Sequence, residues 1–174
     1  MFDKLIEFLL NIIEDIMPVF FVKQYNNGIL LRMGKFVRVV KPGVVFKIPF
    51  LDKVEITTIV TTTLSVPTQS VITKDKKQLV VKSVVKYKIS DVELFMLNVY
   101  DSTDAISDIT QAIVKEQISL RTFEECTDND FDNTVTKKLR VEMKKWGIEV
   151  DRVTLTDIGQ IKSLRLFNEG ALIG

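Results

Sequence analysis

The sequence contains no histidine and only one cysteine, Cys126, among its 174 residues. The missing histidines remove the commonest general base, the commonest metal ligand and the usual pH-sensitive side chain. A single cysteine excludes an intramolecular disulfide framework and a thiolate zinc cluster, and it favours a reducing compartment. We therefore expect no enzymatic activity, no cofactor and no bound metal.

Five carboxylates lie close together in the sequence, at Glu124, Glu125, Asp128, Asp130 and Asp132. A calcium loop would need a glycine at its sixth position and a glutamate at its twelfth, and the glycine is missing. The simpler interpretation is that these charges complement the dipole of a helix that begins here. Cys126 stands beside two of the glutamates, which predicts a raised thiol pKa and argues against a nucleophile.

The net charge of +1 hides a strong asymmetry along the chain. Residues 23–90 hold 13 Lys/Arg against 3 Asp/Glu, whereas residues 91–174 hold 10 against 16. The basic half could face an anionic surface, or it could dock onto the acidic half of another copy. It could also simply use lysine as the solvent-facing residue of its strands. Nucleic-acid binding is poorly supported, because the basic strands lack interleaved exposed aromatic residues.

The first 18 residues, MFDKLIEFLLNIIEDIMP, form the most apolar stretch of the chain. Five charged residues argue against a simple transmembrane span, and the spacing predicts an amphipathic helix that Pro18 ends. Its polar residues share one narrow arc. Its apolar face consists of Phe2, Leu5, Ile6, Phe8, Leu9, Leu10, Ile12, Ile13, Ile16 and Met17.

Two uses fit such a helix. It could lie in a membrane interface, although membrane-surface helices usually place Lys and Arg on the polar face and this one is acidic. It could also pack against a partner protein or a second copy. A cleaved signal peptide does not fit, because the start is not basic and no small-residue cleavage site follows.

The next part of the chain reads as short strands joined by tight turns. Strands are predicted at 19–24, 29–33, 36–40 and 44–48. The expected turns are Asn26-Asn27-Gly28, Gly34-Lys35 and Pro42-Gly43, where Pro42 sets φ and Gly43 supplies a positive φ. Pro49 should break the fourth strand, so we regard Gly34, Pro42, Gly43 and Pro49 as the residues that define the turns.

Residues 54–64 alternate apolar and polar side chains, which predicts one half-buried strand that ends at Val66-Pro67. A hairpin tip is expected at residues 74–77. The alternation of residues 79–89 then predicts the clearest strand of the chain, with lysines on its open face.

The periodicity becomes helical after Asp91, which should cap a short helix that reaches Asn98. A second helix is predicted over residues 104–120, and Thr127 with Asp130 suggests a capping box for a third. That third helix has a stripe of apolar residues and should stop at Gly147; the stripe is Phe131, Val135, Leu139, Met143 and Trp146. A strand over residues 148–158 would close an α+β fold.

Three segments, in this order and spacing, resemble the SPFH family of stomatins, prohibitins, flotillins and the bacterial HflK/HflC pair. The segments are NNGILLRMGKFVRVVKPGVVFKIPFLDKVE, VPTQSVITKDKKQLVVKSVVKYKISD and WGIEVDRVTLTDI. The resemblance implies an antiparallel β-rich first half, then helices and a closing strand, with an N-terminal amphipathic helix in front. It also implies a non-enzymatic scaffold that sits on one membrane leaflet and associates side by side into rings or cages.

The expected organisation is a helix at residues 1–18, an SPFH domain at 19–160 and a short tail at 161–174. The domain should divide into a β-rich part, 19–73, and an α/β part, 74–160. Family members usually continue into a long coiled coil, for which this tail is too short, so we expect any oligomer to use the domain and the N-terminal helix.

The functional hypothesis is a self-associating scaffold held by its N-terminal helix on the cytoplasmic side of a membrane. The alternative is a soluble, cytoplasmic or particle-associated protein that forms a ring or collar in a larger particle such as a virion. The expected partners are other copies of the chain, and also membrane lipids or another protein of a larger assembly.

Overall fold

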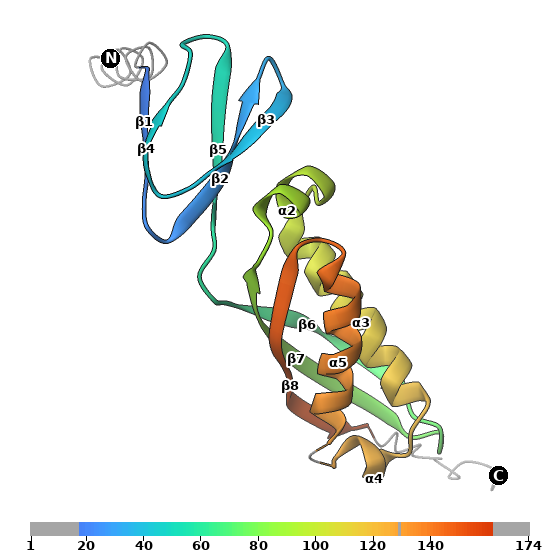
Figure 1. The fold of residues 1–174 in the computed structure, drawn as a ribbon. Coiled ribbons are helices and arrows are strands. Elements are labelled where there is room, and N and C mark those ends of the chain that lie inside the picture. The colour runs from blue at the N-terminus through green and yellow to red at the C-terminus, as the bar shows by residue number, and fades with distance from the viewer. Residues whose placement is uncertain (1–17, 129, 162–174) are drawn as a thin grey trace, which may run out of the picture.

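The computed structural model describes residues 18–128 and 130–161, so the helix predicted at the N-terminus lies outside the described residues. The chain forms an elongated molecule with strands at one end and a helix-covered sheet at the other (Figure 1). The described elements are, in order, β1 Val19–Val22, β2 Asn26–Arg32, β3 Lys35–Val40, β4 Gly43–Phe46, β5 Asp52–Thr58, β6 Thr62–Ile72, β7 Gln78–Ile89, α2 Val92–Asn98, α3 Ser102–Ser119, α4 Phe123–Cys126, α5 Phe131–Lys144 and β8 Ile148–Gln160.

The first part consists of two small antiparallel sheets, β1-β4 and β3-β2-β5. They enclose a small core of aliphatic side chains, namely Val22, Leu30, Val40 and Val45. Strand β2 is buried on both faces. Leu30 lies in this small core, whereas the neighbouring Ile29 belongs to the larger core of the second part.

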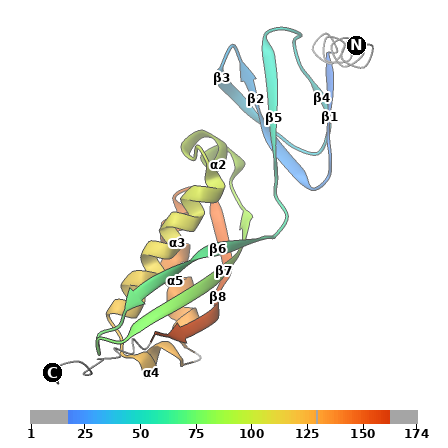
Figure 2. The same ribbon diagram turned by 180° about the vertical axis from the view of Figure 1, so that it is seen from behind.

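The second part is an antiparallel sheet of order β6-β7-β8. Helices α3 and α5 cover one face of this sheet, and the other face is open in the reverse view (Figures 1 and 2). The alternation of β7 places Leu79, Val81 and Val85 under the helices. The predicted α+β order of strands, then helices, then a closing strand is therefore confirmed.

The prediction of one strand over residues 54–64 was wrong. The stretch divides into β5, which pairs with β2, and β6, which pairs with β7. The amide of Ile59 donates to the carbonyl of Tyr25 at 3.0 Å, and there the chain leaves the first sheets. The strand pairing thus changes at residues 59–61.

Pro67 does not end the strand as predicted, because β6 continues through it to Ile72. The register with β7 shifts between Val66 and Gln69, which marks a bulge. A proline has no amide hydrogen to donate, so it is tolerated on an edge strand where the ladder is interrupted.

The turn predicted at Asn26-Asn27-Gly28 was also wrong, because these residues begin β2. The turn comes earlier, and the Asn26 amide closes it by donating to the carbonyl of Lys23 at 3.0 Å. Gly28 serves a different purpose there. A Cβ at this position would lie 2.1 Å from the carbonyl oxygen of Glu55, so only glycine lets β2 and β5 approach this closely.

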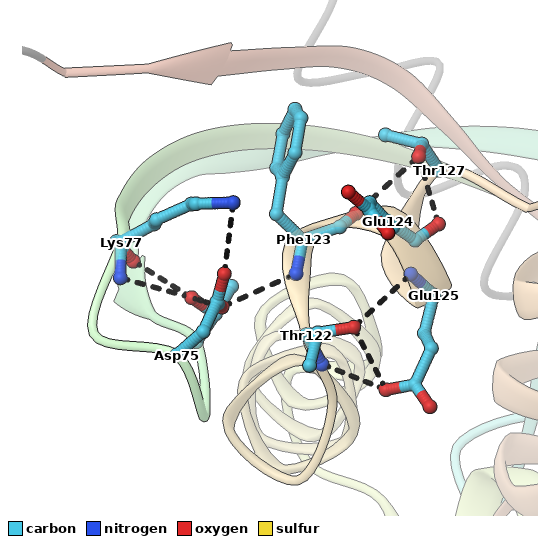
Figure 3. A network of polar contacts seen from close by, with 8 residues as sticks. Asp75, Lys77, Thr122, Phe123, Glu124, Glu125 and Thr127 are labelled. Carbon is cyan, nitrogen blue, oxygen red and sulfur yellow. Dashed lines mark hydrogen bonds and ion pairs between the residues drawn. The ribbon is translucent and has the colours of Figure 1, made fainter.

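The capping box lies at Thr122 and Glu125, at the start of α4, and not at Thr127 and Asp130 as predicted. The Glu125 carboxylate accepts from the Thr122 amide at 2.8 Å. Thr127 instead donates its hydroxyl to the carbonyls of Phe123 and Glu124 in the same short helix (Figure 3). The error arose because both segments match the same short pattern of a hydroxyl followed by an acid three residues later.

The Asp75 carboxylate joins the β6-β7 hairpin to the start of α4 (Figure 3). It accepts from the Thr73 hydroxyl at 2.6 Å and from the Phe123 amide at 3.2 Å, and it forms an ion pair with Lys77 at 2.9 Å. The Thr73 hydrogen bond, followed by that of Lys77, lowers the pKa of Asp75 to about 2. This network closes the end of the molecule that lies farthest from the first sheets.

Gly147 ends the α5 segment with φ +70°, and its carbonyl accepts from the amides of Ser90 and Asp91 and from the Ser90 hydroxyl. A Cβ at residue 147 would lie 2.3 Å from the Asp91 carbonyl oxygen. The residue therefore combines a left-handed conformation with a close backbone contact at the start of α2.

We predict that Gly147→Ala lowers the free energy of unfolding by about 2 kcal/mol, because it adds both strain and a clash with backbone. Thermal unfolding followed by circular dichroism measures this effect. Gly159→Ala is the matched control, since a Cβ there would meet nothing closer than 4.0 Å. Equal losses in the two variants would contradict the role assigned to Gly147.

Candidate functional site

Within residues 18–128 and 130–161, no group of three or more His, Cys, Asp or Glu side chains is placed to hold a metal ion. Cys126 is buried, and burial raises the pKa of its thiol, with a smaller contribution in the same direction from Glu125. A thiol with a raised pKa is a poor nucleophile. The features worth considering are therefore surfaces, and the apolar ones are the most unusual.

The β2-β3 turn and the β4-β5 loop expose two large apolar side chains at the end of the first part. Met33 is 78% exposed and Phe50 is 84% exposed. Both adopt a positive φ, 49° for Met33 and 65° for Phe50, which is uncommon for residues other than glycine. Backbone strain of this kind is typical of functional sites.

The turn and the loop are joined, because the Met33 amide donates to the carbonyl of Leu51 at 2.8 Å. Ile48 and Leu51 are exposed beside them. We call the four side chains Met33, Ile48, Phe50 and Leu51 the apolar tip. The amide of Lys47 donates to the carbonyl of Pro18 at 2.9 Å, so the residue that precedes β1 lies beside the strand end that leads into this tip.

Asp52 holds the loop of the apolar tip in place. Its carboxylate accepts two hydrogen bonds from the Arg32 guanidinium, at 2.7 and 3.1 Å, and one from the amide of Ile48 at 2.9 Å. The hydrogen bonding to Arg32, and to a smaller extent the bond from the Ile48 amide, lowers the pKa of Asp52 to about 2. The Asp52 side chain is itself buried although it stands next to the exposed loop.

A second apolar surface lies on the outer side of the β1-β4 ribbon. Phe21 pairs directly with Val44, so the two side chains share one face, and Phe46 lies on the same face opposite Val19. Phe21 is 71% exposed and Phe46 is 72% exposed. We call Phe21, Val44 and Phe46 the ribbon face. Lys23 follows β1 in the sequence, and Lys41 precedes β4.

A third apolar surface runs along α2. Leu94 and Leu97 are exposed residues of α2, and Tyr100, which follows the end of the helix, is 99% exposed. We call these three residues the α2 stripe. It borders an open cleft of about 460 Å³ between β5 and the α2-α3 connection, whose walls include Ile56 and Asp101.

The predicted turn residues lie around the first two surfaces. Gly34 has φ +78° in the β2-β3 turn, and Gly43 has φ +127° where β4 begins. Pro42 precedes that strand, and Pro49 leads into Phe50 within the β4-β5 loop. The turn at Gly34 is centred on Met33-Gly34, one residue earlier than expected. The ten apolar residues of the N-terminal helix lie outside the described residues.

Sequence reasoning missed Met33 and Phe50 as surface features, because it placed Met33 at the end of a strand and assigned no role to Phe50 after the break at Pro49. The available signal was an apolar residue placed directly beside a turn-forming Gly34 or Pro49. In the described part of the chain, no helix has both the length and the apolar character needed to cross a membrane.

We predict that Asp52 contributes stability above about pH 4, and that this contribution is lost as the pH falls toward 2. The pKa is lowered in the folded state from the ordinary 3.8, so the folded state favours the ionised form. Thermal unfolding of wild type and Asp52→Asn between pH 2 and 6 tests this. The difference in Tm should shrink toward pH 2, and a difference that is independent of pH would contradict the assignment.

Residues 20–164 match the SPFH domain / Band 7 family. The chain is 34% identical over 142 residues to an uncharacterized protein of Methanocaldococcus jannaschii, covering 79% of this chain and 70% of that protein. It is 30% identical to a stomatin homologue of Pyrococcus horikoshii, covering 79% of this chain and 52% of the homologue. It is 35% identical to the modulator of FtsH protease HflC of Escherichia coli, covering 69% of this chain and 37% of that protein.

The chain therefore spans from about a third to 70% of the length of these relatives. The match to the family extends from β1 beyond the last residue of β8, so it includes both parts of the fold. The chain belongs to the SPFH domain / Band 7 family, whose members are non-enzymatic scaffolds.

Proposed function

We propose that this protein is a self-associating scaffold on the cytoplasmic face of a membrane, with its apolar tip directed toward the lipid. The observation on which the proposal rests is that the β2-β3 turn and the β4-β5 loop lie at the same end of the molecule as the start of β1 (Figure 1). An N-terminal apolar segment and an exposed apolar loop pair at the same end would provide two anchors, and two anchors hold a protein on a bilayer far better than one.

The chemistry of the tip fits a membrane interface. Phe50 and Met33 expose large apolar side chains that gain free energy when they leave water, at roughly 25 cal/mol per Å². Lys35 lies two residues after Met33, and Lys47 directly precedes Ile48, so cationic side chains that attract anionic headgroups are close to the tip in the sequence. The Asp52 carboxylate is buried and forms an ion pair with Arg32, so its negative charge does not oppose that attraction.

Self-association is supported by two further surfaces of opposite character. The ribbon face stands next to Lys23 and Lys41, whereas the α2 stripe is accompanied by Glu93 and Asp101. Apolar patches bordered by opposite charges can dock head to tail between copies. Such heterologous contacts close into rings when the rotation between copies allows it.

The soluble ring or collar remains the second candidate, and the α2 stripe is the observation that favours it. Tyrosine is enriched in protein interfaces, so the fully exposed Tyr100 supports contact with a protein at this stripe. In that case the N-terminal helix would be buried between subunits, and the oligomer would persist without lipid.

We predict that Phe50→Asp combined with Met33→Asp reduces flotation of the full chain with liposomes, because each change places a charge where apolar groups enter the interface. Flotation is measured by the fraction of protein that rises with vesicles in a density gradient. Ile72→Asp combined with Val141→Asp is the matched control, since both residues are exposed apolar residues of the second part.

A loss confined to the tip variant supports membrane contact through the tip. Equal flotation of the tip variant, the control and wild type would refute it. A full chain that never floats but forms a defined ring would favour the soluble candidate.

We predict that Leu97→Asp and Phe21→Asp each prevent assembly alone, but that their mixture forms a one-to-one dimer. Each variant retains one intact surface, so a head-to-tail contact can form once and then stops. Particle mass measured by light scattering distinguishes the species, and circular dichroism checks that both variants fold. Single variants with the wild-type mass, or a mixture that stays monomeric, would contradict head-to-tail docking of these two surfaces.

A further inference from the structure

Three cationic side chains line one small pocket between α5 and β8. Lys137 and Arg140 come from α5 and Arg152 comes from β8, around a cavity of about 260 Å³. The remaining walls are Asn133, Thr136 and Asp151. Among the ion pairs of residues 18–128 and 130–161, none involves any of these three cations. Such a gathering of positive charge is unexpected in the acidic half of the chain.

A bulge in β8 brings two consecutive side chains to this pocket. Lys86 pairs with Arg152 while Tyr87 pairs with Val150, so Asp151 is an extra residue in β8. In a regular strand Asp151 and Arg152 would point to opposite faces, but here both are exposed and both line the cavity. Bulges often re-aim side chains at functional sites.

Arg140 is fixed in place by the bulge. Its Nε donates to the carbonyl of Val150 at 2.7 Å, and its Nη2 donates to the carbonyl of Asp151. A guanidinium has five N–H groups, so most of its donors are still available for a ligand. Because the side chain is already ordered, binding an anion there costs little conformational entropy.

The acidic groups nearby do not neutralise the pocket. The Asp151 carboxylate forms an ion pair with Lys86 at 3.4 Å. The Asp130 carboxylate accepts a hydrogen bond from the side-chain amide of Asn133. The Asp132 carboxylate accepts from the amide of Leu155. The lining therefore holds three cations against the single carboxylate of Asp151, and that carboxylate is also paired with Lys86.

We propose that this pocket binds a soluble anion that bears a phosphate group. Arginine and lysine in combination are the usual recognition set for phosphate, with arginine supplying a planar fork of donors. The cavity is slightly smaller than the roughly 300–1,000 Å³ of pockets for drug-sized ligands, so it suits one phosphate with a small substituent. A soluble source is favoured over a lipid headgroup, since α5 and β8 lie in the opposite part of the molecule from the apolar tip (Figure 1).

The test is isothermal titration of inorganic pyrophosphate into the full chain at low salt. We expect saturable one-to-one binding that weakens at least about tenfold in the double variant Lys137→Gln, Arg152→Gln. Both side chains are exposed, so the fold should survive, and circular dichroism checks it. The control is Lys115→Gln with Lys144→Gln, which removes the same charge at exposed positions outside the pocket and should change affinity less than about twofold.

Binding that weakens equally in both double variants, or that never saturates, would overturn the proposal by showing a general charge effect. A second arm measures flotation with vesicles that contain phosphatidylserine. If the pocket variant loses flotation while pyrophosphate does not bind, the anion is a lipid headgroup and the assignment to a soluble ligand is wrong. Lys137 and Arg152 lie outside the apolar tip, so a failure to bind pyrophosphate leaves the membrane proposal untouched.

Discussion

The burial of β2 on both faces is the constraint on which the rest of the structure depends. Leu30 packs into the small core of the first part, while Ile29 packs into the large core of the second part. A strand that serves two cores cannot slip by one residue, because the slip would exchange the two faces. Gly28 tightens this constraint by bringing β2 and β5 into backbone contact. The apolar tip takes its position from this strand, because the β2-β3 turn that carries Met33 begins where β2 ends.

The surfaces differ in how they are built. The apolar tip consists of side chains on turns, held by the Arg32–Asp52 pair and by the bond from Met33 to Leu51. The ribbon face and the α2 stripe are the outward sides of regular elements whose inward sides fill a core. The cationic pocket depends on an irregularity, the bulge at Asp151. Locally strained or irregular backbone therefore occurs both at the tip proposed to meet lipid and at the pocket proposed to bind an anion.

Helices and strands with a strong local pattern of apolar residues could be predicted from the sequence, whereas the strands that pair with one another could not. The alternation of β7, the capping of α2 by Asp91 and the stop at Gly147 are local signals, and the structure contains all three. The break between β5 and β6 was missed because one alternating pattern suits either sheet. Pairing with β2 or β7 is decided by contacts distant in sequence. The tip and the pocket were missed for a related reason, since turn conformation and a bulge determine which side chains become exposed together.

The order of strand pairing has a consequence for how the protein emerges from the ribosome. Every pairing of the first part is complete once Thr58 has been made, so this part can form its small core early. The sheet of the second part lacks its third strand until β8 has been synthesised, and β8 supplies Val150 and Val153 to the large core. The edge of β7 that will pair with β8 therefore stays open while the more than 50 residues between these two strands are synthesised. The second part is therefore the segment whose unpaired strand is exposed longest to other nascent chains.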